Sequence, residues 1–266
     1  MSGVRPLVMG VLNVTPDSFS DGGEWYDRDA AVARGLEMVA EGADVVDVGG
    51  ESSRPGAEPV PEAEELARVV PVVAALAPHV RVSVDTTKAA VAEAAVAAGA
   101  SLLNDVSASL EVVAARLGVG WVAMHMRGTP ATMQQDPRYD DVVGEVAAFL
   151  AGRIGAADAA GVGEIWVDPG IGFGKTGPHN LALLAGLDRL VALGRPVLVG
   201  TSRKSFLGRV GAGTEGSEPE LDVHDRLEPS LATAVWAMES GAAMVRVHDV
   251  APTVQAARLL SEPVPV

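Results

Sequence analysis

The chain has 266 residues, of which 48% are hydrophobic and 21% charged, and its formal net charge is −15. This length suits two average domains or one α/β barrel, and the apolar content is ample for a large core. The negative charge argues against non-specific nucleic-acid binding, and the lack of cysteine excludes disulfides, zinc–thiolate sites and a thiol nucleophile.

The N-terminal sequence MSGVRPLVMG has no signal-peptide core, and no apolar run approaches the roughly 18 residues that span a bilayer. We therefore expect a cytoplasmic protein with no membrane segment. The first apolar run, residues 8–12, ends at Asn13 and leads into a polar loop that holds Phe19. This loop is either one wall of a site or a surface loop whose aromatic side chain packs back onto the body.

Glycines recur along the chain in one setting, after a stretch with helical periodicity and before a short apolar run. Glycine just past a helix can take the left-handed conformation that closes the last turn, so each position predicts a helix that leads into a strand. The six positions are Gly42, Gly99, Gly118, Gly161, Gly194 and Gly241. A seventh helix is predicted to end at Pro78-His79, and Pro71 within it is expected to cause a kink.

With the first apolar run, this pattern predicts eight short strands, at residues 7–12, 45–48, 81–84, 101–104, 121–124, 165–167, 197–199 and 244–247. Short apolar strands separated by helices are typical of a parallel sheet buried on both faces. Eight βα units in about 250 residues favour a TIM (β/α)8 barrel, with an open doubly wound sheet as the alternative. No linker divides the chain, so we expect residues 1–266 to form a single domain, with a surface loop at residues 211–225.

Polar or ionisable side chains stand at the carboxyl end of every predicted strand, where barrel active sites form. Inward-facing carboxylates and amides suit a flat heterocycle with several N–H groups, while arginine suits phosphate oxygens or stacks on a flat ring. The sequence therefore predicts a site for a nitrogen heterocycle with a phosphorylated arm. These side chains include Asn13, Asp47, Asp85, Asn104, His125, Asp168, Ser202, Lys204, Arg246 and His248.

Other short segments resemble nucleotide-binding motifs but lack residues that those motifs require. Gly174-Lys175-Thr176 looks like the end of a P-loop, but Pro169 stands where that motif needs glycine. The glycine-rich residues 170–174 lack dinucleotide spacing and are interpreted as a flexible loop after the sixth strand. Three histidines, at 79, 179 and 224, are interpreted as surface or capping residues, whereas His125 either belongs to the site or is a polar residue satisfied at the barrel rim.

Eight segments, in order along residues 8–260, resemble the dihydropteroate synthase family. They are VLNVTPDSFSDGG, DVGGESSRPGA, SVDT, NDVS, MHMRGTPATMQ, DPGIGFGK, GTSRKSFLG and RVHDV. The resemblance implies a TIM barrel, usually a homodimer, that uses Mg²⁺. It also implies a reaction in which 4-aminobenzoate and 6-hydroxymethyl-7,8-dihydropterin diphosphate give 7,8-dihydropteroate and pyrophosphate.

The resemblance implies a role for individual residues, with Asp85, Lys204 and Arg246 as the catalytic group. The pterin would be held by Asp85, Asn104, Val106, Met124, Asp168, Lys204 and Arg246. The diphosphate would be held by Asn13, Ser53, Arg246 and His248, with Mg²⁺ at Asn13. The aminobenzoate site would be formed by Phe19, Arg54, Pro55, Phe173 and Ser202. Departures from the family pattern are Ser53 in place of threonine, Ile171 in place of another apolar residue, and Glu228-Pro229 in place of a small pair.

A mechanism follows from these roles. Departure of the diphosphate leaves a pterin-methyl cation, Asp85 offsets its charge, and the neutral arylamine attacks without a strong protein base. Phe19 is expected to lie on a lid that closes once diphosphate is bound and keeps water from the cation.

Two alternatives stay open. A pterin-binding methyltransferase barrel would share Asp85, Asn104 and Asp168 but has no use for the Phe19 loop or for Ser202-Arg203-Lys204. A non-catalytic paralogue would be expected to have lost Arg54, Lys204 or His248, all of which are present.

Overall fold

The computed structural model describes residues 5–15, 28–52, 57–211 and 221–261. Its strands form one eight-stranded parallel sheet in the order β6-β5-β4-β3-β2-β1-β8-β7. The strands are β1 (Leu7–Asn13), β2 (Val45–Gly49), β3 (Arg81–Asp85), β4 (Leu102–Asp105), β5 (Gly120–Met124), β6 (Ile165–Asp168), β7 (Leu198–Val199) and β8 (Met244–Val247). A parallel bridge between Val167 and Val197 joins the two ends of this order and closes the ring. The predicted (β/α)8 barrel is therefore confirmed.

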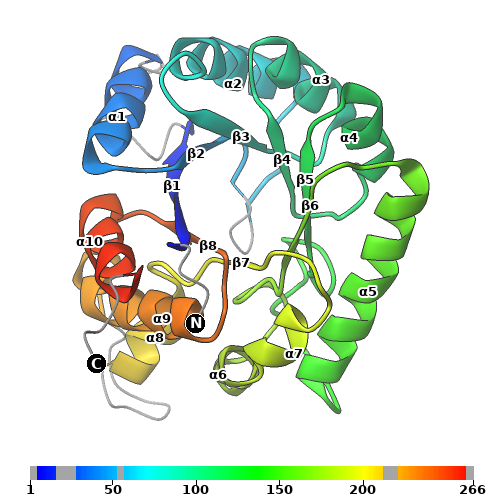
Figure 1. Ribbon diagram of the computed structural model, residues 1–266, viewed down its shortest axis with the longest axis vertical. Helices are drawn as coiled ribbons and strands as arrows, with labels where there is room; N and C mark the ends of the chain where they lie inside the picture. The colour runs from blue at the N-terminus through cyan, green and yellow to red at the C-terminus, as the bar shows by residue number, and fades with distance from the viewer. Residues whose placement is uncertain (1–4, 16–27, 53–56, 212–220, 262–266) are drawn as a thin grey trace.

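Helices surround the strands as an outer layer (Figure 1). They are α1 (Arg28–Glu41), α2 (Glu62–Leu76), α3 (Ala89–Ala97), α4 (Glu111–Leu117), α5 (Val142–Ala160), α6 (Gly177–Ala185), α7 (Leu187–Val191), α8 (Ser205–Gly211), α9 (Leu227–Glu239) and α10 (Val250–Ser261). Among the residues that the structure describes, no helix combines the length and the apolar character that crossing a bilayer requires.

The predicted helix ends are confirmed at the glycines. All six have positive φ, and Gly118 and Gly161 are left-handed C-caps, with φ of 69° and 86°. Helix α2 continues through Pro71 to Leu76, and its predicted kink stays a prediction. The predicted surface loop at residues 211–225 is described only in part, and it includes a short 3-10 helix, η2 (Val223–Asp225).

The barrel interior is built in two layers because side chains alternate along each strand. The lower layer is an apolar cluster of Met9, Val45, Leu102, Val122, Trp166, Leu198 and Met244. Two residues further along the same strands stand Val11, Asp47, Asn104, Met124, Asp168, Gly200 and Arg246. Strand alternation thus places a mostly polar layer on an apolar floor, at the carboxyl-terminal mouth of the barrel.

Candidate active site

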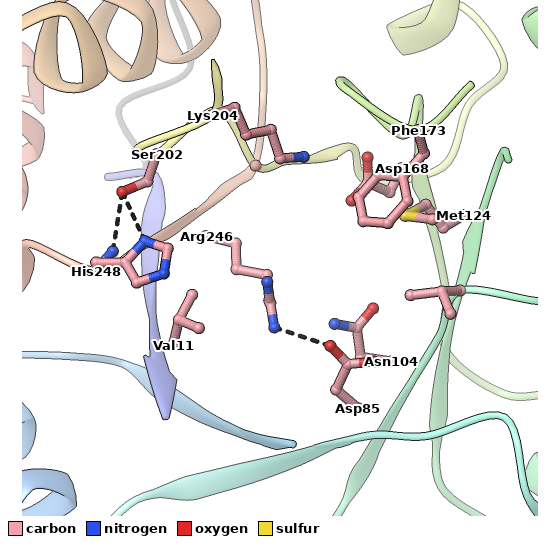
Figure 2. Close-up of a pocket in the computed structure, with 12 residues that line it drawn as sticks. Val11, Asp85, Asn104, Met124, Asp168, Phe173, Ser202, Lys204, Arg246 and His248 are labelled. Carbon is pink, nitrogen blue, oxygen red and sulfur yellow. Dashed lines mark hydrogen bonds and ion pairs between the residues drawn. The ribbon is translucent and has the colours of Figure 1, made fainter. Parts of the chain in front are cut away.

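A pocket with about 440 Å³ of empty space, part of it open to solvent, lies at the carboxyl ends of the strands (Figure 2). Its residues come from elements far apart in the sequence. They are Val11, Asp85, Asn104, Val106, Met124, Asp168, Phe173, Gly200, Ser202, Lys204, Arg246 and His248. The pocket thus contains carboxylates, an amide, cations and an aromatic ring around one space.

This pocket brings together most of the residues that the sequence singled out. All the predicted pterin residues line it, as do Phe173, Ser202 and His248. Asn13 ends β1 at the same mouth, opposite Gly49 of β2, and does not line the pocket. Phe19, Ser53, Arg54 and Pro55 lie outside the described residues, and so does the predicted lid.

Arg246 lies between two carboxylates. Its Nε donates a hydrogen bond to Asp47 Oδ2 at 2.6 Å, and Nη2 donates to Asp85 Oδ2 at 2.9 Å. The same Asp47 oxygen accepts a hydrogen bond from Asn104 Nδ2 at 2.9 Å. One arginine on β8 therefore links β2 and β3 across the barrel and faces the pocket with its charge largely compensated.

Burial sets the charge state of the carboxyl beside it. Burial raises the pKa of Asp85 to about 7, although the neighbouring Arg246 opposes this rise. The negative charges of Asp47, Glu65 and Asp105 also raise the pKa of Asp85. In the free protein this carboxyl therefore titrates close to neutral pH.

Lys204 reaches the pocket from the turn after β7. Its Nζ donates a hydrogen bond to the Ile171 carbonyl and lies 4.7 Å from the centre of the Phe173 ring. Figure 2 shows the ammonium pointing toward Asp168. Burial lowers the pKa of Lys204 to about 8, although the negative charge of Asp168 opposes this change. Burial also raises the pKa of Asp168. This carboxylate accepts a hydrogen bond from the Gly170 N–H at 2.7 Å.

A buried lysine holds the glycine-rich loop after β6. Lys175 Nζ contacts His125 Nδ1 at 2.9 Å and donates to the carbonyls of Gly170 and Phe173 at 3.0 and 2.9 Å. Gly170 has a φ of 64°, and a Cβ there would lie 1.9 Å from the His125 carbonyl oxygen, so only glycine fits. The stretch is a loop after β6, as predicted, and these contacts fix the part that carries Phe173.

His125 is the partner of this lysine. It is buried, and burial and the nearby Lys175 charge lower the pKa of His125 to about 3, so the imidazole is neutral and Nδ1 accepts the lysine hydrogen bond. Of the two interpretations of His125, the structure supports the polar residue satisfied at the rim. His179 caps helix α6 together with Thr176, which confirms its predicted capping role.

The ends of β7 and β8 meet through a serine and a histidine. Ser202 Oγ accepts a hydrogen bond from the His248 backbone N–H at 3.1 Å, and lies 3.0 Å from His248 Nδ1. Arg203 has a positive φ of 58° and donates to Asp249 with Nε at 3.1 Å, which ties the two turns together. In barrels of this type, the loops after strands seven and eight frequently bind phosphate.

The described residues at the mouth offer few ligands for a metal ion. Within the described residues, no group of three or more His, Cys, Asp or Glu side chains could hold a metal ion. Mg²⁺ commonly binds through one or two protein oxygens, substrate phosphates and waters. The amide oxygen of Asn13 therefore fits a Mg²⁺ ion that arrives with a diphosphate, and does not fit a site made of protein ligands alone.

Two residues with clear structural partners received no role from the sequence. The sequence places Asp47 at a strand end, and an acid inside the buried run VVDVG is the signal that a partner must exist. In the sequence, Lys175 belongs only to an incomplete P-loop pattern. The signal for a partner is its charge, which follows a glycine-rich stretch at the mouth of the barrel.

Comparisons with known proteins match nearly the whole chain. The family model for pterin binding enzymes matches residues 9–248. A dihydropteroate synthase of Mycobacterium leprae is 49% identical over 262 residues, which cover 95% of this chain and 92% of that protein. The structure of Xanthomonas albilineans dihydropteroate synthase with 4-aminobenzoic acid is 47% identical, with a TM-score of 0.89, and the match covers 100% of this chain and 96% of that one.

The same Xanthomonas albilineans enzyme in complex with 7,8-dihydropteroate has a TM-score of 0.85 and 44% identity, covering 100% of this chain and 97% of that one. These matches extend over the complete barrel and over the mouth at which the pocket lies. The chain therefore belongs to the dihydropteroate synthase family of pterin-binding transferases.

Proposed function

We propose that this pocket joins 4-aminobenzoate to (7,8-dihydropterin-6-yl)methyl diphosphate, forming 7,8-dihydropteroate and releasing pyrophosphate. The observation that carries the proposal is the combination of Asp85, Asn104 and Asp168 with Lys204 and Arg246 around one pocket. Relatives with 4-aminobenzoic acid or 7,8-dihydropteroate bound support the same reaction. The Mg²⁺ requirement, the homodimer and the cytoplasmic location stay predictions.

The hydrogen-bond acceptors of the pocket suit the pterin ring. Two carboxylates and one amide oxygen accept hydrogen bonds from ring N–H and amino groups, while Val106 and Met124 contact its apolar surface. Arg246 offers the planar face of its guanidinium, which is held in place by hydrogen bonds from Nε to Asp47 and from Nη2 to Asp85. These contacts would orient the methylene carbon toward the side of the pocket that holds Lys204 and Phe173.

The diphosphate belongs on the β7–β8 side. His248 lies there, and Arg246 adds positive charge from β8. Asn13 would hold the Mg²⁺ that neutralises charge on the leaving diphosphate. As the methylene C–O bond breaks, its electron pair leaves with the diphosphate, and positive charge spreads into the pterin ring.

The carboxylate of Asp85 stabilises that developing positive charge by proximity. The amine of 4-aminobenzoate supplies its lone pair to the methylene carbon, a C–N bond forms, and the nitrogen then loses a proton to solvent or to pyrophosphate. Lys204 and Phe173 shape the side from which the amine approaches. A neutral arylamine is already nucleophilic, so the site does not need a strong base.

A bell-shaped pH dependence of kcat/KM for the pterin diphosphate is the expected consequence. Asp85 must be ionised to offset the cation, so activity should fall as pH drops below its pKa of about 7. Lys204 must be protonated to act as a cation, so activity should also fall as pH rises above its pKa of about 8. Rates measured from about pH 5 to about pH 10 at saturating 4-aminobenzoate give both limbs.

The variant Asp85→Asn assigns the acid limb, because it carries no carboxyl to titrate at this position. Lys204→Arg assigns the basic limb, because arginine stays charged across the range. If both limbs persist unchanged in these variants, then other groups control the profile and the assigned charge roles are wrong.

One assay tests the function itself. Purified protein is mixed with the pterin diphosphate, labelled 4-aminobenzoate and Mg²⁺, and the product is separated by chromatography. Labelled 7,8-dihydropteroate and equimolar pyrophosphate are expected, and reactions without the pterin or without the protein are the controls. Tight pterin binding without any product would instead indicate the non-catalytic paralogue.

A further inference from the structure

Asp47 is a buried carboxylate that contacts two residues of the pocket, Asn104 and Arg246. Its side chain is 0% exposed, and it stands on β2, in register with Val11 of β1. Its Oδ2 accepts hydrogen bonds from both Arg246 Nε and Asn104 Nδ2, while Oδ1 has no hydrogen-bond partner among the described residues. A buried charge with an unpartnered oxygen is costly for folding, which points to a role in function.

The chemistry of this contact decides how Asn104 faces the pocket. An ionised carboxylate only accepts hydrogen bonds, so the Asn104 group that meets Asp47 must be its NH₂. The Asn104 carbonyl oxygen is therefore turned away from Asp47, and this side chain lines the pocket beside Asp85 (Figure 2). Without Asp47, the amide could rotate by half a turn and present a donor in place of an acceptor.

We propose that Asp47 is a positioning residue for pterin recognition, which locks the Asn104 amide with its oxygen toward the ligand and aligns Arg246 beside Asp85. The ligand class rests on the function proposed above. The pocket then presents three acceptors, from Asp85, Asn104 and Asp168, and this set selects a heterocycle edge made of N–H donors. Asp47 touches neither the ligand nor the reacting atoms.

The first test compares Asp47→Ala with Asp47→Asn, using 6-hydroxymethyl-7,8-dihydropterin as the probe because it lacks the diphosphate. Alanine removes both hydrogen bonds, so the Kd measured by calorimetry is expected to rise by about tenfold to a hundredfold. Asparagine can place its carbonyl oxygen where Oδ2 lies and accept both hydrogen bonds, so a Kd within about threefold of the unmodified protein is expected. The KM for 4-aminobenzoate is expected to change by less than about twofold in both variants.

The second test is a double-mutant cycle. Asn104→Ala removes the amide that Asp47 holds, and its pterin affinity is expected to fall at least about tenfold. In the Asn104→Ala background, Asp47→Ala has no amide left to misorient, so it is expected to lower the affinity by a clearly smaller factor than it does in the unmodified protein. A purely structural role for Asp47 would lower the affinity by the same factor in both backgrounds.

Ser83→Ala is the matched control. Ser83 is the register partner of Asp47 on β3, it is equally buried, and its hydroxyl has no hydrogen-bond partner among the described residues. Its loss is expected to leave pterin affinity unchanged. Should Asp47→Ala fail to fold, Asp47→Leu replaces it in both tests, because leucine fills a similar space and accepts no hydrogen bond.

Three results would overturn the proposal: a folded Asp47→Ala variant with unchanged pterin affinity, equal rises in the KM of both substrates, or equal losses of pterin affinity from Asp47→Ala with and without Asn104. The proposed function fails separately, when the unmodified protein neither binds the pterin nor forms product.

Discussion

Replacement of Lys204 by alanine is expected to lower kcat/KM by about a hundredfold or more. The ammonium group lies against the Ile171 carbonyl and the Phe173 ring, and faces Asp168 across the pocket. Its removal takes away a cation from the place where both the pterin and the incoming amine would sit. Steady-state rates with each substrate varied in turn measure the loss.

Thermal stability should change little in the same variant. Burial already lowers the pKa of Lys204, which means that the folded state holds this charge at a cost. Arg209→Ala is the control, because Arg209 is an exposed cation on the helix that follows Lys204. If Lys204→Ala turns over at nearly the unmodified rate, the lysine is only a charge at the rim and its assigned role is wrong.

The barrel could be predicted because its signals are local. Each strand is a short run of apolar residues, and six of the strands follow a helix and a glycine with positive φ. The predicted strand at residues 197–199 shows the limit, because the structure has only Leu198–Val199 there and joins Val197 to β6 through an isolated bridge. Strand ends depend on pairing across the sheet, which the sequence does not display.

The pocket could be predicted for a related reason. In a parallel barrel all carboxyl ends of strands meet at one mouth, so a polar residue at each end becomes a neighbour of the others. The ion pairs and hydrogen bonds inside the pocket could not be predicted in the same way. Arg246 and Asp47 are 199 residues apart, and nothing in VVDVG indicates which cation compensates its acid. Likewise, the four polar contacts of Lys175, two of them to His125, become visible only when residues 170–175 and the end of β5 are placed in space.

Replacement of Arg246 by alanine is expected to reduce both activity and stability. It removes the cation that lies between Asp47 and Asp85, so one buried and one largely buried carboxylate lose their partner. Loss of one member of a buried ion pair commonly costs about 3–5 kcal/mol of unfolding free energy. Because the guanidinium would also contact the pterin and the diphosphate in the proposed reaction, kcat/KM should fall by about a hundredfold to a thousandfold.

The size of the stability loss should depend on pH, and its sign follows from Asp85. The pKa of Asp85 in the folded protein, about 7, lies above the ordinary value of 3.8, so the folded state keeps a proton that the unfolded chain has released. This proton contributes its full share of the unfolding free energy below the pKa that Asp85 has in the unfolded chain. That contribution is lost as pH rises through the pKa that Asp85 has in the folded protein. Arg246 lowers the pKa of Asp85, so without it the carboxyl holds its proton to higher pH, and ionising it costs more.

Urea unfolding at about pH 5.5 and about pH 8.5 therefore separates the two states of Asp85. The unfolding free energy lost in Arg246→Ala is expected to be larger at the higher pH, where the unmodified protein has Asp85 ionised against Arg246. Arg195→Ala is the matched control, since its pair with Asp158 at 2.6 Å is partly exposed and contributes about 0–1 kcal/mol at either pH. An equal loss at both pH values would show that Arg246 does not compensate the Asp85 charge, and that the fall in activity comes from lost ligand contacts alone.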